Sequence, residues 1–487
     1  MTDIEYTSTR DATVLADAAT AVVNGISADG GLYVPKTLPA LKVSDFSGCD
    51  YAARAALVLD AFFGFDTSGI ADAAYSGFDG DPAPTVKLDD NLFVLELWHG
   101  KTHAFKDMAL SVLPHLLVRA KKSKGDGKKT LILVATSGDT GKAALEGFKN
   151  VAGTEVCVFY PTDGVSDVQK KAMQTQDGDN MFAAGITGNF DDAQTAVKKA
   201  FGDAALCRAL DARGIELSSA NSINIGRLVP QITYYFSAYC DLVDSGEIKN
   251  GDKVDFVVPT GNFGNILAGW YAKQMGLPIS KLVCASNRNN VLTDFISTGT
   301  YDVNREFYKT ESPSMDILVS SNLERLIFET SGRNAALTAR RMAELKQTGR
   351  YSVSPEEIEK IREVFAADYA DDEDIEQAIA DMFDEYGYLI DTHTAAAYAV
   401  AQRRQFVRPT MIVSTANPFK FAPAVLKALG EPVKGEATED VLHELEDLTA
   451  MDAPESLVNV FKAPVRFTDV VSPDEITEFV AERYAGK

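Results

Sequence analysis

The sequence is poor in basic residues relative to acidic ones. Its 487 residues include 47 lysines and arginines against 70 aspartates and glutamates, a formal net charge of −23 at pH 7. An acidic surface repels phosphate backbones, which argues against a nucleic-acid partner. No apolar run reaches the roughly 18 residues that a membrane-spanning helix needs, and Asp3 and Glu5 stand where a signal peptide carries bases. We therefore expect a cytoplasmic protein without a membrane partner.

Cysteine and histidine are also scarce. The five cysteines are odd in number and form no C-x-x-C pair, which suits reduced thiols in a reducing compartment. Cys157 and Cys284 lie in apolar runs and are expected to be buried. The five histidines show no ligand spacing such as H-E-x-x-H. The sequence thus predicts neither a disulfide framework nor a metal site.

What is present is typical of a globular α/β protein. Apolar residues make up 46% and charged residues 24% of the chain. Short β-branched runs alternate with amphipathic stretches, and the strands expected are residues 129–136, 156–160, 181–186, 254–258, 282–285 and 410–414. This alternation predicts parallel sheets covered by helices. Ligands bind at the carboxyl ends of such strands, so the loops there are the places to look for chemistry.

At about 150 residues per domain, the length suggests two or three domains. The Gly-, Asp- and Pro-rich residues 76–84 look like a linker. We divide the chain into an N-terminal domain (1–95), a smaller α/β domain (96–225) and a larger α/β domain (226–487) with a helical insertion around 330–400. Residues 351–388 are acidic and predicted to be helical, with Ser354 as N-cap and Pro355 at the first helical position.

The loop with the clearest binding motif is Gly261-Asn262-Phe263-Gly264-Asn265, between an expected strand and an expected helix. The two glycines let backbone N–H groups approach an anion, and a helix N-terminus adds unpaired donors. The loop lacks the lysine and the spacing of a nucleoside-triphosphate loop. It is predicted to cradle a phosphate, although a plain tight turn is the alternative if the loop is considered alone.

A second loop, Ser137-Gly138-Asp139-Thr140-Gly141-Lys142, also follows a strand. It is not a Walker loop, because Thr136 stands where the first glycine is required and Ala143 where Ser or Thr is required. Its two hydroxyls and helix-start donors suit a further anionic group, either a carboxylate or a phosphate.

A third candidate is Lys106. A lone lysine is usually a surface charge, but apolar Ala104 and Phe105 precede this one and an apolar stretch, residues 108–117, follows it. A desolvated lysine has a depressed pKa, which is what Schiff-base chemistry requires.

Residues 97–107, Leu-Trp-His-Gly-Lys-Thr-His-Ala-Phe-Lys-Asp, resemble the H-G-P-T-x-A-F-K-D segment of the threonine synthases, whose lysine carries pyridoxal phosphate. Further blocks resemble that family in the same order along the chain: residues 6–10 with 28–35, 137–141, 221–227, 261–265, 314–317, 322–325 and 414–421. The match is to the bacterial and fungal type, which has a long N-terminal region.

The resemblance implies fold type II of the pyridoxal-phosphate enzymes, with two α/β units of the tryptophan synthase β-like architecture around the cofactor and an added N-terminal unit. It implies that Lys106 holds the cofactor, that Thr415 faces the pyridine nitrogen and that the cofactor phosphate is held by Gly261, Asn262, Phe263, Gly264 and Asn265. The implied substrate is O-phospho-L-homoserine, with water as co-substrate and L-threonine and phosphate as products. Our candidates for binding it are Ser137, Asp139, Thr140, Asn224 and Arg227. We expect a monomer or a homodimer.

Four residues depart from the family pattern. They are Lys101 in place of Pro, His103 in place of a small or apolar residue, Asp11 in place of Gly, and Asn417 in place of His. None is Lys106 or lies in the phosphate loop, so the expected reaction class is unaffected. His103 is interpreted as a packing variant, with a proton carrier as the alternative.

Two rival functions are open at this point. Another β-replacing or eliminating enzyme of the same fold, such as a serine/threonine dehydratase or a cysteine synthase, would share the lysine. Those families usually have S-G-N and a more glycine-rich phosphate loop, whereas this chain has Asp139 and Phe263. The other rival is a non-catalytic homologue that binds a phosphorylated ligand, and the presence of Lys106 argues against it.

Overall fold

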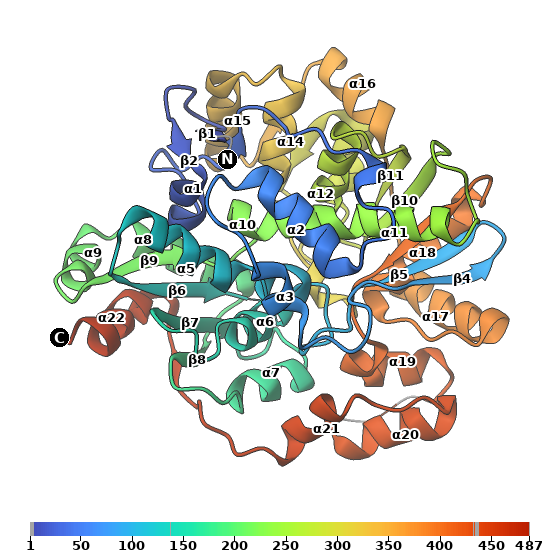
Figure 1. The fold of residues 1–487 in the computed structure, drawn as a ribbon. Coiled ribbons are helices and arrows are strands. Elements are labelled where there is room, and N and C mark those ends of the chain that lie inside the picture. The colour runs from blue at the N-terminus through green and yellow to red at the C-terminus, as the bar shows by residue number, and fades with distance from the viewer. Residues whose placement is uncertain (1–3, 137, 432, 434–437, 487) are drawn as a thin grey trace.

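Two sheets form the centre of the molecule in the computed structural model, which describes residues 4–136, 138–431, 433 and 438–486 (Figure 1). Within those residues the larger sheet has the strand order β14-β11-β10-β15-β5-β4 and the smaller one β16-β8-β7-β6-β9. All neighbours pair in parallel except β4 and β5. The expected α/β class is therefore confirmed. The strands are β4 (Thr85–Asp89), β5 (Leu92–Glu96), β6 (Lys129–Ala135), β7 (Thr154–Pro161), β8 (Met181–Ile186), β9 (Ile215–Ser219), β10 (Val254–Pro259), β11 (Ile279–Ser286), β14 (Phe365–Tyr369), β15 (Thr410–Ser414) and β16 (Val470–Val471).

Helices follow the strands as the alternation predicts. Each of the six strands expected from the sequence is present to within three residues at either end, and Cys157 and Cys284 are buried in two of them. The helices that follow these strands are α6 (Asp139–Gly147), α7 (Asp167–Gln174), α8 (Phe190–Gly202), α12 (Gly264–Gln274), α13 (Val291–Thr298) and α19 (Ala422–Ala428). No helix of the described residues is long and apolar enough to cross a membrane.

The acidic region 351–388 contains a strand that we expected to be helical. Ser354 does cap α16 (Pro355–Val364) and shares a capping box with Glu357, as predicted. The acidic run after residue 370 starts α17 (Asp372–Tyr386). Between these helices, however, residues 365–369 form β14, which pairs in parallel with β11 at the edge of the sheet. Five residues between two capped helices carry little periodic signal, and pairing with a strand that is distant in sequence decides their structure.

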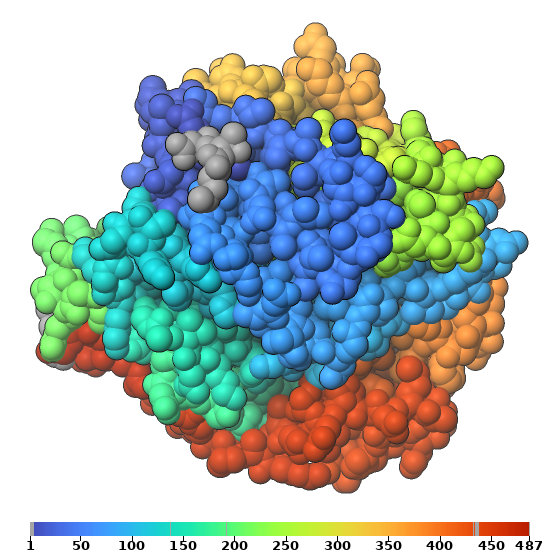
Figure 2. All heavy atoms as spheres, in the orientation of Figure 1, coloured from blue at the N-terminus to red at the C-terminus, as the bar shows by residue number. Residues whose placement is uncertain are grey.

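Sheet pairing also crosses the expected domain boundaries. Strands β4 and most of β5 precede residue 96, yet both belong to the larger sheet, where β5 pairs with β15. Near the other end of the chain, β16 pairs with β8 of the smaller sheet. The C-terminal residues therefore run along the lower edge of Figure 1 from the larger sheet to the smaller one, and Figure 2 shows them along the same edge of the surface.

The N-terminal residues lie across both α/β units. Helix α1 (Ala18–Asn24) packs on α5 (Leu113–Lys124), while α2 (Tyr51–Phe62) packs on α11 (Ile232–Asp244). These residues cover the centre of the face seen in Figure 2. A small sheet of β1 (Glu5–Ser8), β2 (Ala16–Asp17) and β3 (Tyr33–Pro35) completes this part.

Candidate active site

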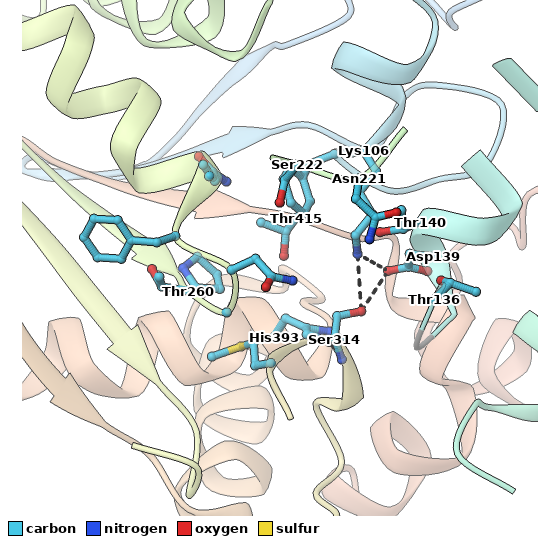
Figure 3. A pocket seen from close by; sticks show the side chains of 18 of the residues that line it. Lys106, Thr136, Asp139, Thr140, Asn221, Ser222, Thr260, Ser314, His393 and Thr415 are labelled. Carbon is cyan, nitrogen blue, oxygen red and sulfur yellow. Dashed lines mark hydrogen bonds and ion pairs between the residues drawn. The ribbon is translucent and has the colours of Figure 1, made fainter. Parts of the chain in front are cut away.

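One cavity brings together the loops that the sequence analysis singled out (Figure 3). It lies at the carboxyl ends of β6, β10 and β15, as expected for parallel sheets. The residues that line it include Lys106, Thr136, Asp139, Thr140, Asn221, Ser222, Arg227, Thr260, Gly261, Asn262, Phe263, Gly264, Asn265, Ser314, His393 and Thr415.

Lys106 lies in a desolvated environment, as the apolar residues on either side of it in the sequence predict. It precedes α4 (Asp107–Leu110), and the segment before it is fixed to the end of β15, because the Phe105 N–H donates to the Thr415 carbonyl at 2.8 Å. The Lys106 side chain is 11% exposed. Burial lowers the pKa of Lys106, although the nearby Asp139 carboxylate opposes this shift.

Asp139 is an anion between two cations. Its Oδ2 lies 3.2 Å from Lys106 Nζ and also accepts from the Ser314 hydroxyl at 3.2 Å. Its Oδ1 accepts from Gln169 Nε2 at 2.8 Å and lies 2.7 Å from Lys420 Nζ. Burial alone would raise the pKa of Asp139, but the two ammonium groups outweigh burial and hold that pKa well below its usual range. Asp139 therefore faces Lys106 as a negative charge.

The Gly261–Asn265 loop lines the cavity and contains unpaired polar atoms. Phe263 has a φ of +62° and turns the backbone into α12, which begins at Gly264. Asn262 Oδ1 and Asn265 Nδ2 are buried and have no hydrogen-bond partner. Since buried polar groups are normally paired, these atoms, together with the N–H groups at the start of α12, point to a ligand with both donors and acceptors.

Arg227 is a buried cation without an anionic partner. It lies on α10 (Ile225–Leu228), and its Nη1 donates to the Ala220 carbonyl at 2.5 Å. Its Nε has no partner, and no carboxylate among the described residues forms an ion pair with it. Burial lowers the pKa of Arg227 to about 10. A buried charge is costly unless it is paired, so the cavity is built to receive an anion.

The remaining predicted residues divide into three groups. Thr140 and Thr415 line the cavity beside Lys106. Ser137 lies outside the described residues. The Asn224 side chain is used elsewhere, because its Oδ1 caps α10 and its Nδ2 donates to the carbonyls of Val22 and Ser219. Asn224 supports the segment that carries Arg227 and does not line the cavity.

Three residues of this site were absent from our candidates, namely Ser314, His393 and Lys420. Ser314 lies 3.3 Å from Lys106 Nζ, and its backbone N–H donates to His393 Nε2 at 3.1 Å. His393 lies in the first turn of α18 (Thr392–Arg404), and its Nδ1 lies 2.8 Å from an Asp391 carboxylate oxygen. Ser314 and Lys420 both lie in blocks that resemble the family, so the family resemblance could have identified them as candidates. A single histidine in a helix gave no signal for His393.

The four departures from the family pattern lie outside the cavity. His103 has a φ of +53°, contacts Ser456 and lines a second cavity with Lys420. This placement favours the interpretation of His103 as a packing variant. Asn417 caps residues 418–421, Asp11 accepts from Thr13 at an exposed turn, and Lys101 is exposed.

Comparison with known sequences covers nearly the whole chain. Three sequence-family models match: "Threonine synthase N terminus" over residues 5–73, "Pyridoxal-phosphate dependent enzyme" over 82–415 and "Threonine synthase, C-terminal" over 394–480. The threonine synthase of Pseudomonas aeruginosa is 39% identical over 438 residues, which cover 87% of this chain and 90% of that protein. The chain belongs to the threonine synthase family of pyridoxal-phosphate enzymes. The resemblance seen in the sequence is thereby confirmed.

Other relatives agree with this assignment. A structure of threonine synthase with bound pyridoxal phosphate from Brucella melitensis superposes with a TM-score of 0.86 at 35% identity, covering 99% of both chains. The expected fold type is thus confirmed. The human protein "Threonine synthase-like 1" is 40% identical over 451 residues, which cover 88% of this chain. The chain spans about 60% of the length of the threonine synthase-like 1 proteins that it matches.

The residues present fit the cofactor of this family. Pyridoxal phosphate needs an amine for its aldehyde, donors for its phosphate and a polar group near its ring nitrogen. The cavity holds one desolvated lysine, and on its opposite side lies a glycine-containing helix start with unpaired amide atoms. A Cβ on Gly261 would lie 2.9 Å from the Ser314 carbonyl, so this backbone passes where a side chain has no room.

Proposed function

We propose that the protein is a threonine synthase that converts O-phospho-L-homoserine and water to L-threonine and phosphate, the last step of threonine biosynthesis. The observation that carries this proposal is Arg227, a buried guanidinium with an unpaired Nε and no ion-pair partner among the described residues, in the same cavity as Lys106. The cofactor phosphate has its own cradle at Gly261–Asn265. The guanidinium of Arg227 therefore calls for a second anion, which the substrate phosphate supplies. We further propose a cytoplasmic location and a monomeric or homodimeric state.

We assign the cofactor to Lys106, to the loop Gly261, Asn262, Phe263, Gly264 and Asn265, and to Thr415. When bound, pyridoxal phosphate supplies the electron sink that stabilises negative charge developing on substrate carbon. Thr415 would present a hydroxyl to the ring nitrogen, and a hydroxyl does not hold that nitrogen protonated as a carboxylate does.

Lys106 is the group that moves protons. Its Nζ takes a proton from the substrate Cα, serves the proton transfer at Cβ and later returns a proton to Cα. One amine performs these steps only if its pKa lies near the working pH, and burial lowers the pKa of Lys106 in that direction. Asp139 and Ser314, at 3.2 and 3.3 Å, fix the position of Nζ between these transfers.

Arg227 and Thr140 bind the anionic groups of the substrate. A guanidinium gives a planar, two-point contact to a phosphate or carboxylate, and charge-assisted bonds of this kind are among the strong ones. The hydroxyl of Thr140, at the start of α6, adds a neutral donor on the Lys106 side of the cavity.

The test is an assay of the cofactor-loaded enzyme with O-phospho-L-homoserine, in which threonine and phosphate are measured together. Equal amounts of both products are expected, and Lys106→Ala should abolish both. Phosphate released with a 2-oxo acid instead of threonine would indicate elimination without addition of water. Deamination of L-serine or L-threonine with no use of O-phosphohomoserine would indicate a dehydratase. Tight ligand binding without any turnover would indicate a non-catalytic homologue.

A further inference from the structure

Lys420 is a buried lysine directly behind the site. It lies in residues 418–421, just after β15, and its side chain is 4% exposed. Its Nζ lies 2.7 Å from Asp139 Oδ1 and donates to the Thr102 carbonyl at 2.7 Å. The opposite oxygen of Asp139 faces Lys106. The two ammonium groups therefore hold one carboxylate between them, and only Lys106 lines the cavity.

The two lysines differ in what happens to their charge. Lys106 must give up its positive charge to act as a nucleophile and as a base. At that moment Asp139 loses one of its two cations, and a buried carboxylate left without a cation tends to take up a proton. Lys420 does not line the cavity and takes no part in the chemistry, so its contact with Asp139 persists throughout.

We propose that Lys420 is a positioning residue, which holds Asp139 in its ionised form with Oδ2 directed at Lys106 during proton transfer. The inference rests on the proposed role of Lys106 and deepens it. Without Lys420, Lys106 would be the one ammonium group of these two left beside Asp139, so the Asp139–Lys106 pair would hold its proton to higher pH and Lys106 would give up its charge less readily.

Other charged or titratable groups face these residues, and none of them is mutated in the test. Arg227 of α10 interacts electrostatically with Lys106, and His393 of α18 interacts electrostatically with Asp139. Lys420 also interacts electrostatically with Asp107 of α4 and with His103. Gln169 of α7 offers a matched control, because it donates to the same oxygen, Asp139 Oδ1, but carries no charge.

The experiment is a pH titration of the visible absorbance that pyridoxal phosphate gives on Lys106 in the holoenzyme. An added cation disfavours the protonated nitrogen of that linkage, and an anion favours it. Lys420→Met should therefore move the titration midpoint up by about one pH unit or more. Lys420→Arg should restore the wild-type midpoint, and Gln169→Leu should change it little. Asp139→Asn should move the midpoint in the opposite direction, down.

A midpoint that stays in place or falls in Lys420→Met would overturn the proposal, as would equal shifts in Lys420→Met and Gln169→Leu. Lys420→Gln serves the same measurement if methionine prevents folding. If neither variant folds, Asp139→Asn decides, because an unshifted midpoint would remove Asp139, and Lys420 with it, from the proton chemistry of Lys106. The titration uses no substrate. A wrong substrate assignment would therefore leave this result intact, and failure here would leave the threonine assay unaffected.

Discussion

Arg227 is the residue at which burial and function are most directly linked. A guanidinium without a partner anion lowers the stability of the empty site and strengthens binding of a ligand anion. Arg227→Lys keeps the charge but loses the planar two-point contact. We expect kcat/KM for O-phosphohomoserine to fall by about tenfold or more, since a charged hydrogen bond contributes roughly 1.5–3 kcal/mol. Arg119→Lys, at an exposed ion pair, is the matched control. An unchanged kcat/KM in the Arg227 variant would remove this residue from the site.

His103 makes stability depend on pH. Burial, followed by the charge of Lys420, lowers the pKa of His103 from 6.5 to about 4. The unfolded chain therefore binds more protons between these values, and stability is lost as the pH falls from 6.5 towards 4. For a shift of this size the loss is about 3 kcal/mol. His103→Asn, which tolerates the positive φ, should reduce this loss. Denaturant unfolding at pH 7.5 and pH 5 measures it, and equal losses in both proteins would contradict the assignment.

At the scale of elements, the loop before α12 and the segment around Ser314 pack backbone against backbone. A Cβ on Gly261 would lie 2.9 Å from the Ser314 carbonyl, whereas one on Gly264 would meet only side-chain atoms, at 3.4 Å. Gly261→Ala should therefore weaken binding of pyridoxal phosphate more than Gly264→Ala does, with small effects on folding. Equilibrium dialysis of the cofactor measures the difference. Equal affinities in the two variants would indicate that the loop does not adopt this packing.

The same scale shows what the sequence predicts and what it does not. Strands with buried β-branched runs, such as β6 and β10, and the capped start of α16 were predictable, because each depends on local pattern. Strand β14 was not, because its structure depends on pairing with β11. At the site, Lys106 and the loop after β10 could be identified from motifs. The buried contacts of Asn224 and Lys420 could not, since their partners lie up to 318 residues away in sequence.

At the scale of the whole molecule, the C-terminal residues connect the two sheets. Phe467 and Phe479 pack on Phe182 of β8, with ring centroids 5.2 and 5.5 Å apart, and Ile476 is fully buried. A chain ending at residue 463 loses these contacts, and each buried side chain contributes about 1.5–3 kcal/mol. We expect amide hydrogen exchange to accelerate in the smaller sheet, at β7 and β8, while β10 and β15 stay protected. Uniform acceleration in both sheets would show that they unfold as one unit.

The central claim is that Lys106 carries the cofactor in a cavity formed by both α/β units. Borohydride reduction of the cofactor-loaded protein followed by peptide mapping tests it most directly, because reduction fixes the cofactor to the lysine that holds it. The account predicts one pyridoxyl group, on the peptide that contains Lys106, and none in Lys106→Ala, while Lys101→Ala keeps the label. A pyridoxyl group on any other lysine of the wild-type chain would contradict the site, and with it the role proposed for Lys106.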